Sequence, residues 1–163
     1  MIRKDRQVMD RELQLQILDA CDVMRVAFKG DGAFPYVVPV SFGYAWDEDA
    51  RADGLPTLYF HGAKIGRKAE LVLADPHVCV EFDRFIRYDQ LKHGVTARYQ
   101  SLIGLGLVTE VTDLDEKVRG LQLLCNHCGY KGFAPAACGS LAPTRVWRID
   151  LSDLAGKQNL RKL

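Results

Sequence analysis

Short turns join several of the segments that the sequence predicts as strands, and this feature limits the possible folds more than any other. Residues 22–28 and 35–44 both have a strand pattern, and a glycine-containing turn at 29–32 lies between them. Residues 57–61 form the next predicted strand and complete a hairpin. Parallel strands need a crossover of about a dozen residues or more, so these local connections favour an antiparallel sheet.

The rest of the chain adds strands and helices to the same domain. Further strands are predicted at 77–83, 99–111 and 144–151, and helices at 11–20, 65–73 and 113–124, with Asp10 and Asp113 as N-caps. This pattern predicts a mixed α/β, mainly β protein, built as an antiparallel barrel with peripheral helices. We expect one domain over 1–163, with a charged arm at 1–9 and a mobile basic tail at 157–163.

Composition and charge exclude several classes of partner. The net charge is +1, so we expect no general nucleic-acid-binding surface. No apolar run approaches the length of a membrane span, and the charged N-terminus is not followed by the apolar segment of a signal peptide. We therefore expect a cytoplasmic protein whose five cysteines are mostly reduced.

The stretch from Phe60 to Leu71 predicts an anion site. An apolar strand runs into a turn of small residues, and two adjacent cations, Arg67 and Lys68, stand at the opening of a helix. A helix N-terminus has free N–H groups and a partial positive charge, and the two side chains add to both. The arrangement suits a phosphate group. The alternative is a solvated basic first turn.

Pro39 interrupts the strand predicted at 35–44. Proline cannot donate a hydrogen bond to a sheet, so a central strand should not contain one. One explanation is a strand at a sheet edge or at a bulge. The other is that a ligand, rather than a neighbouring strand, lies beside the backbone here.

Two further segments have weaker signals. Gly104 and Gly106 do not form a dinucleotide-binding loop, because the third glycine and the following helix are missing. They predict a bulge or a close approach of another backbone. Residues 89–98, which include His93, are polar and irregular in pattern, and we interpret them as a loop that could cover a site.

A cluster of soft ligands lies near the predicted third helix. Cys125, His127, Cys128 and Cys138 together are a weak zinc signal, because the usual second ligand pair is absent. Redox chemistry would need a setting that stabilises a thiolate, and the sequence does not show one. We interpret the cluster as reduced thiols at a helix end and predict no metal site.

Taken together and in order, three motifs resemble the pyridoxamine-phosphate-oxidase-like FMN-binding split-barrel proteins, and most closely their nitroimidazole-resistance (nitroimidazole reductase) branch. The motifs are PYVVPVS at 35–41, YFHGA at 59–63 with GRK at 66–68, and YQSLIGLG at 99–106. The combination covers most of the chain.

This resemblance implies a six-stranded split β-barrel that forms a homodimer with FMN at the subunit interface. By position, the flavin-binding residues would be Val38, Pro39, Val40, Ser41, His61, Gly62, Arg67, Lys68, Ser101 and Trp147. The first four would meet the flavin ring through their backbone, and Arg67 and Lys68 would hold the phosphate. Ser101 would come from the second subunit, at a position where the oxidases have an amide side chain.

The activity implied is that of an FMN-dependent oxidoreductase that reduces a small electrophile, such as a nitroaromatic compound. Because the unperturbed pKa of histidine is near neutrality, our hypothesis is that His61 supplies a proton. The last strand lacks a match to the residues with which the oxidases bind pyridoxal phosphate, which argues against oxidation of vitamin B6. Alternatives are a haem-binding protein on the same barrel with His61 or another histidine as axial ligand, a non-enzymatic flavin-binding module, and a deazaflavin enzyme.

Overall fold

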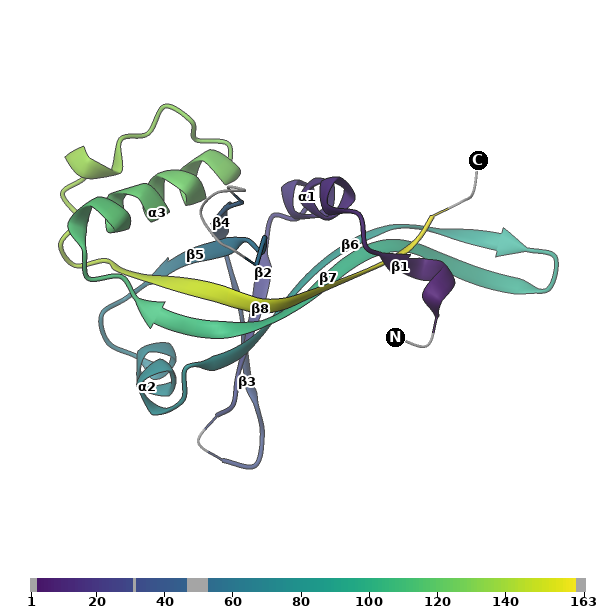
Figure 1. Cartoon of the computed structure of the whole chain (residues 1–163), viewed down its shortest axis with the longest axis horizontal. Coiled ribbons are helices and arrows are strands. Elements are labelled where there is room, and N and C mark those ends of the chain that lie inside the picture. The colour runs from purple at the N-terminus through teal and green to yellow at the C-terminus, as the bar shows by residue number, and fades with distance from the viewer. Residues whose placement is uncertain (1–2, 31, 47–52, 161–163) are drawn as a thin grey trace.

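The computed structural model describes residues 3–30, 32–46 and 53–160, and within these the chain forms one antiparallel sheet with helices around it (Figure 1). Neighbouring strands follow the order β3-β2-β6-β7-β8-β5-β4, and β1 pairs with β8. The strands are β1 (Gln7–Val8), β2 (Met24–Phe28), β3 (Tyr36–Val40), β4 (Phe42–Ala45), β5 (Thr57–Gly62), β6 (His77–Leu91), β7 (Gly94–Glu110) and β8 (Arg145–Asn159).

The sheet closes on itself because its two terminal strands are consecutive in the chain. Only Ser41 separates β3, which pairs with β2, from β4, which pairs with β5. These two strands are therefore halves of one strand whose pairing partner changes at Ser41. The predicted mainly β, antiparallel split barrel is confirmed. The described residues form eight strands rather than six, since one strand is divided and β1 adds a short pair.

Pro39 does not interrupt its strand as the sequence suggested. It stays within β3 opposite Arg25, and the break falls two residues later, at Ser41. Because β3 has a strand neighbour on one side only, a residue without an N–H is tolerated there. The edge-strand explanation is therefore sufficient for the fold.

Within the described residues, three α-helices and two 3₁₀ turns surround the sheet. They are α1 (Arg11–Asp19), α2 (Arg67–Ala74), α3 (Leu114–His127), η1 (Lys4–Arg6) and η2 (Pro135–Ala137). Both predicted N-caps are confirmed: the Asp10 carboxylate accepts from the Leu13 N–H, and the Asp113 carboxylate accepts from the Glu116 N–H, each at 2.8 Å. None of the helices in the described part of the chain is long and apolar enough to cross a membrane.

The core lies between the curled sheet and its helices and is rich in aromatic rings. The largest fully buried side chains include Trp147, Phe28, Phe42, Phe60 and Phe82. Phe60 stacks on Trp147 at a centroid distance of 5.1 Å, and Phe42 meets Phe82 edge-on at 5.0 Å. These contacts join β4, β5, β6 and β8, so both halves of the barrel share one core.

The glycines of β7 mark a bulge and a close backbone approach, as predicted. The register between β7 and β8 shifts between Leu105 and Gly106. A Cβ atom on Gly106 would lie 2.6 Å from the carbonyl oxygen of Asp150, which no side chain could tolerate without a backbone shift.

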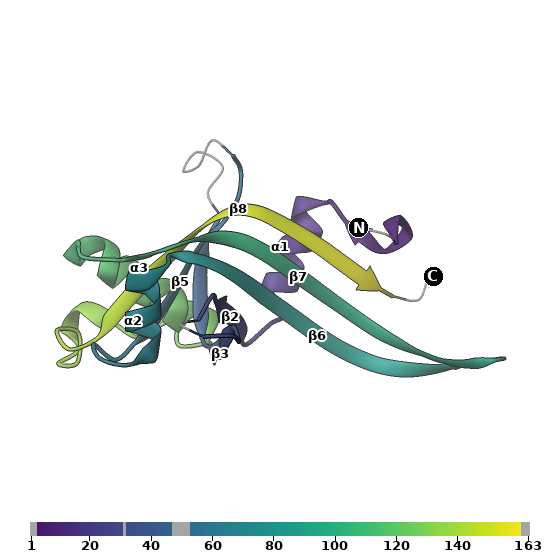
Figure 2. The same ribbon diagram turned by 90° about the horizontal axis from the view of Figure 1, so that it is seen from below.

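The polar segment 89–98 is not a loop over a site, contrary to the sequence interpretation. It forms the outer part of a long β6–β7 hairpin that projects from the barrel, and the pairing continues to Leu91 and Gly94 (Figure 2). His93 lies in the turn at its tip. The segment is polar because both faces of this arm are largely exposed to water, so its strands need no apolar face.

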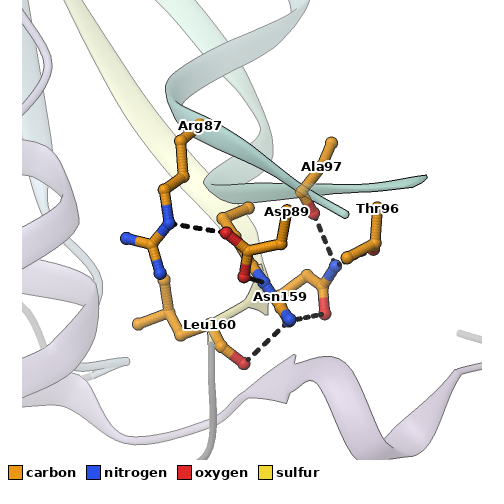
Figure 3. Close-up of polar contacts among 7 residues, drawn as sticks. Arg87, Asp89, Thr96, Ala97, Asn159 and Leu160 are labelled. Carbon is orange, nitrogen blue, oxygen red and sulfur yellow. Dashed lines mark hydrogen bonds and ion pairs between the residues drawn. The ribbon is translucent and has the colours of Figure 1, made fainter. Parts of the chain in front are cut away.

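A polar network fastens the arm to the end of β8 (Figure 3). The Asp89 carboxylate accepts from Arg87 at 2.6 Å and from Arg98 at 2.7 Å. The Asn159 amide donates to the Thr96 hydroxyl at 3.0 Å and to the Ala97 carbonyl at 2.5 Å. Charged and neutral polar groups together thus hold the arm to the end of β8.

The predicted terminal segments are partly sheet. Lys157, Gln158 and Asn159 continue β8 and pair with β7, so the expected mobile tail does not begin at 157. Its last residues, 161–163, lie outside the described residues, as do 1 and 2 of the predicted arm. Gln7 and Val8 of the arm pair with Lys157 and Gly156. This long-range pairing cannot be read from local sequence.

Candidate functional site

The turn between β5 and α2 presents two cations around a small cavity. Gly66, with a φ of 137°, is the N-cap of α2 and provides no side-chain cap. The first two residues of the helix are Arg67 and Lys68. A cavity of about 130 Å³ lies here, lined by Tyr36, Ala63, Ile65, Gly66, Arg67, Lys68 and Ala69. Its walls come from β3 and from the turn, so the fold brings two of the predicted motifs together.

Both cations make cation–π contacts with aromatic rings. The Arg67 guanidinium lies 5.1 Å from the centroid of the Tyr36 ring. The Lys68 Nζ lies 5.9 Å from the centroid of Phe60 and 5.8 Å from that of Trp147. Partial burial lowers the pKa of Lys68, because the charged form loses hydration. A partly buried ammonium group is stabilised by an anionic partner, because the anion replaces part of the lost hydration.

Gly62 is needed where β5 meets this cation. A Cβ atom on it would lie 2.9 Å from the Trp147 ring and 3.1 Å from the Lys68 Nζ. Trp147 itself is 1% exposed, so it forms the floor of the site as a core residue.

Ser41 and His61 both lie at the point where the barrel splits. The pairing of β4 with β5 ends at Phe42 and Phe60, and Ser41 and His61 are the next residues along the two strands. Beyond them β3 has no strand partner on this side. The backbone from Val38 to Ser41 therefore borders the same opening as the turn after Gly62.

One side of His61 borders a second cavity, of about 150 Å³, beneath α3 and η2. Its lining is His61, Leu121, Leu124, Cys125, Phe133, Pro135, Cys138, Ser140, Leu141 and Thr144. Desolvation and the charge of Lys68 lower the pKa of His61. The neutral imidazole is therefore favoured near neutral pH, and a second positive charge beside Lys68 is avoided.

Ser101 is the one predicted site residue that lies apart from the others. It sits within β7 opposite Asp83 of β6 and Lys157 of β8, and it lines neither of the two cavities described above. The other nine predicted residues lie towards one end of the barrel: Val38, Pro39, Val40, Ser41, His61, Gly62, Arg67, Lys68 and Trp147.

The soft-ligand cluster is dispersed. The His127 Nε2 lies 2.9 Å from the Cys21 carbonyl oxygen, and its ring packs on Phe42 at 4.3 Å. Cys128 is exposed, whereas Cys125 and Cys138 both border the cavity beside His61. No group of three or more His, Cys, Asp or Glu side chains in the described residues is arranged to hold a metal ion.

The sequence did not reveal the wall that α3 and η2 build beside His61. Leu121, Leu124 and Phe133 carry no motif, and their proximity to His61 depends on how α3 packs on β4 and β5. The only available signal was the apolar periodicity of α3, which predicts a buried face but not its partner.

Comparison with known proteins finds one matching family model and solved structures of similar fold. A family model described as pyridoxamine 5′-phosphate oxidase matches residues 10–158. A crystal structure of a candidate 5-nitroimidazole antibiotic resistance protein from Bacteroides thetaiotaomicron is 25% identical, with a TM-score of 0.77 over 93% of this chain and 85% of that one. A search of curated proteins gave no match.

Two more distant structures share the fold. An FAD- and haem-binding protein from Mycobacterium smegmatis is 19% identical, with a TM-score of 0.75 over 96% of this chain and 74% of that one. An FAD-binding protein from Mesorhizobium loti is 24% identical, with a TM-score of 0.64 over 95% of this chain and 98% of that one.

Proposed function

Because the chain belongs to the pyridoxamine 5′-phosphate oxidase family, we propose that it binds FMN and acts as an oxidoreductase that reduces a small electrophile such as a nitroaromatic compound. One observation carries the proposal: Arg67 and Lys68 open helix α2 beside a cavity of about 130 Å³. That cavity suits a phosphate group and is too small for a whole flavin nucleotide. The rest of the cofactor must therefore lie outside it.

The residues around this cavity fit the remainder of FMN. The unpaired side of β3 and Ser41 offers backbone to the flavin ring, as the family resemblance assigns to Val38, Pro39, Val40 and Ser41. Gly62 leaves room between Trp147 and the Lys68 Nζ that a side chain would fill. When bound, the flavin supplies transfer of a hydride or of single electrons. The protein's part is to bind it, orient the substrate and limit the access of water.

His61 is placed to hold a proton beside the flavin site. It lies next to Gly62 at the end of the β4–β5 ladder, and one side of it borders the second cavity. Desolvation first, and then the charge of Lys68, lower the pKa of His61. A bound phosphate would offset only the charge of Lys68 and thereby reduce that part of the shift. We therefore assign His61 to donate a proton to the reduced substrate.

A second copy of the chain would complete the site. Ser101 lies away from Arg67 and Lys68, so it can reach a flavin only in a partner subunit. On the same strand Ile103, Leu105 and Leu107 point outward and are 46–50% exposed. They adjoin an apolar groove of about 630 Å³ that Leu105 and Leu107 line together with Phe28, Pro35 and Val78. An exposed apolar face of this kind is typical of a homodimer interface.

The relative from Bacteroides thetaiotaomicron supports the choice of a nitro compound as the electrophile. Haem binding is the second candidate, because one structural relative binds both FAD and haem. An absorption spectrum of the purified protein, with identification of the released cofactor, separates the two. A flavin spectrum with FMN recovered supports the proposal, whereas a haem spectrum would make His61 a candidate axial ligand.

The phosphate assignment is tested with Arg67→Ala, Lys68→Ala and the double variant, using Lys64→Ala as a matched control. Lys64 lies in the same turn, is exposed and does not line the cavity. A hydrogen bond to a charged group contributes about 1.5–3 kcal/mol, so each single loss should weaken FMN binding about 10- to 100-fold. Lys64→Ala should bind FMN nearly as tightly as the unaltered protein. A double variant that purifies fully loaded would overturn the assignment.

A further inference from the structure

The cavity beside His61 has the size and lining of a binding site for a small aromatic molecule. Its volume is about 150 Å³, and apolar side chains from α3 and from the segment after it form most of its wall. An apolar protein cavity of about this volume can hold benzene. The site thus suits a single aromatic ring and excludes fused polycyclic compounds.

The position of the cavity relates it to the flavin site. His61 lines this cavity from β5, and the next residue, Gly62, adjoins Lys68 at the cation cluster. Ser41 and His61 each adjoin the last pair of the β4–β5 ladder, where the barrel splits. A ring held in the cavity would therefore lie next to the backbone that we assign to the flavin.

We propose that this cavity is the substrate pocket, and that it selects electrophilic compounds with one aromatic ring. The inference rests on the proposed function, since it identifies which substrates the flavin would reduce. The wall is formed by Leu121, Leu124, Phe133 and Leu141. Specificity is then set by α3 and the segment from 128 to 144, rather than by the barrel strands.

Polar groups at one side of the pocket orient the ring. The Cys138 Sγ lies 2.9 Å from the Ser140 Oγ, and the Thr144 hydroxyl donates to the Ser140 carbonyl at 2.7 Å. The Ser140 hydroxyl can donate to a polar substituent of the ring, such as a nitro oxygen, in place of its contact with Cys138. The remaining wall offers apolar contact to the ring itself.

The thiols around the pocket give a direct test that needs no turnover. Cys125 and Cys138 line it, whereas Cys128 on the same helix end is exposed and does not. The protein as purified, with any bound flavin oxidised and no electron donor present, is alkylated with iodoacetamide with and without 2-methyl-5-nitroimidazole. Trypsin then separates Cys138, on fragment 132–145, from Cys125 and Cys128 on fragment 120–131, and fragmentation spectra distinguish the latter two.

We expect the compound to slow alkylation of Cys138 about tenfold when present at about ten times its Kd, since that is the fall in the free fraction. Alkylation of Cys128 should not change. 1-Nitropyrene, which has four fused rings, should protect neither thiol. Equal effects on Cys128 and Cys138, or protection by nitropyrene alone, would overturn the proposal.

A pair of variants separates this inference from the proposed function. Cys125→Phe fills the pocket, and Cys128→Phe adds the same ring on the exposed side of the same helix end. Cys125→Phe should raise the KM for the nitroimidazole about tenfold or more with FMN content unchanged, while Cys128→Phe should match the unaltered protein. Protein that binds FMN and reduces the compound, with equal KM in both variants, refutes the pocket alone. Absence of FMN or of any reduction refutes the proposed function, and the protection assay still reports on the pocket.

Discussion

Replacement of Gly43 by alanine should destabilise the protein by an amount that the packing of α3 determines. Gly43 is buried in β4, where α3 crosses the strand. A Cβ atom there would lie 2.3 Å from the Leu124 nitrogen and 2.4 Å from the Leu123 carbonyl carbon. Both atoms belong to the backbone, so no side-chain rotation relieves the overlap. The helix itself must move away from the sheet.

The cost follows from that displacement. Overpacking of a core typically costs about 1–3 kcal/mol, and we expect about 3 kcal/mol here because the contact is backbone against a new methyl group. For a chain of 163 residues, each 1 kcal/mol lowers the melting temperature by about 2–4 °C. The expected decrease is therefore about 6–12 °C.

Urea denaturation of the flavin-free protein at a fixed protein concentration measures the free energy of unfolding, because both bound ligand and association would add to it. Gly139→Ala is the matched control, since nothing lies within 4 Å of a Cβ atom at that position. It should change the free energy of unfolding by less than about 0.5 kcal/mol. If Gly43→Ala is as stable as Gly139→Ala, α3 does not pack on β4 as described.

Three further predictions concern charge and burial. The affinity for FMN should fall as the pH rises towards the lowered pKa of Lys68, because only the ammonium form attracts phosphate. Titration with FMN over pH 7–10 measures this, and the affinity of Lys68→Arg should depend less on pH. Arg98→Ala removes the hydrogen bonds from that guanidinium to Asp89 and Asn159. The arm should lose about 1–2 kcal/mol of local stability, so amide hydrogen exchange in the β6–β7 arm should become about 5- to 30-fold faster, while exchange in β5 should not change. Exchange in the arm as slow as in the unaltered protein would show that the network does not fasten it. Burial raises the pKa of Cys21 to about 11, so alkylation of the folded protein at pH 8 should modify the exposed Cys128 and not Cys21. Because the core favours the neutral thiol, Cys21 contributes stability below its unfolded pKa, and this contribution is lost as the pH rises towards 11.

Features that depend on neighbouring residues were predictable from the sequence. Asp10 and Asp113 cap their helices through N–H groups three residues away, so the signal and the structure are equally local. The same holds for Arg67 and Lys68, whose place at a helix start follows from the turn before them. The helix begins two residues later than predicted, at Arg67, because Gly66 adopts a φ of 137° that a helix cannot include.

Features that depend on residues far apart in the chain were not predictable from the sequence. The arm at 89–98 has no apolar periodicity that would predict strands, and the Arg98–Asn159 hydrogen bond that helps to hold it joins residues far apart in the sequence. The wall beside His61 exists only because Gly43 lets α3 approach β4 closely. A glycine in a strand signals that something packs closely, but it does not say which element that is.

The central position of β8 has a consequence for how the protein is made. Of the described strands it is the last to leave the ribosome, yet it pairs with β7 on one side and with β5 and β1 on the other. Before it emerges, β4–β5 and β3-β2-β6-β7 are separate sheets, with the edges of β5 and β7 open to other chains. Folding can therefore finish only after translation has passed residue 159, and the nascent chain is most prone to aggregate in the interval when β7 has emerged and β8 has not.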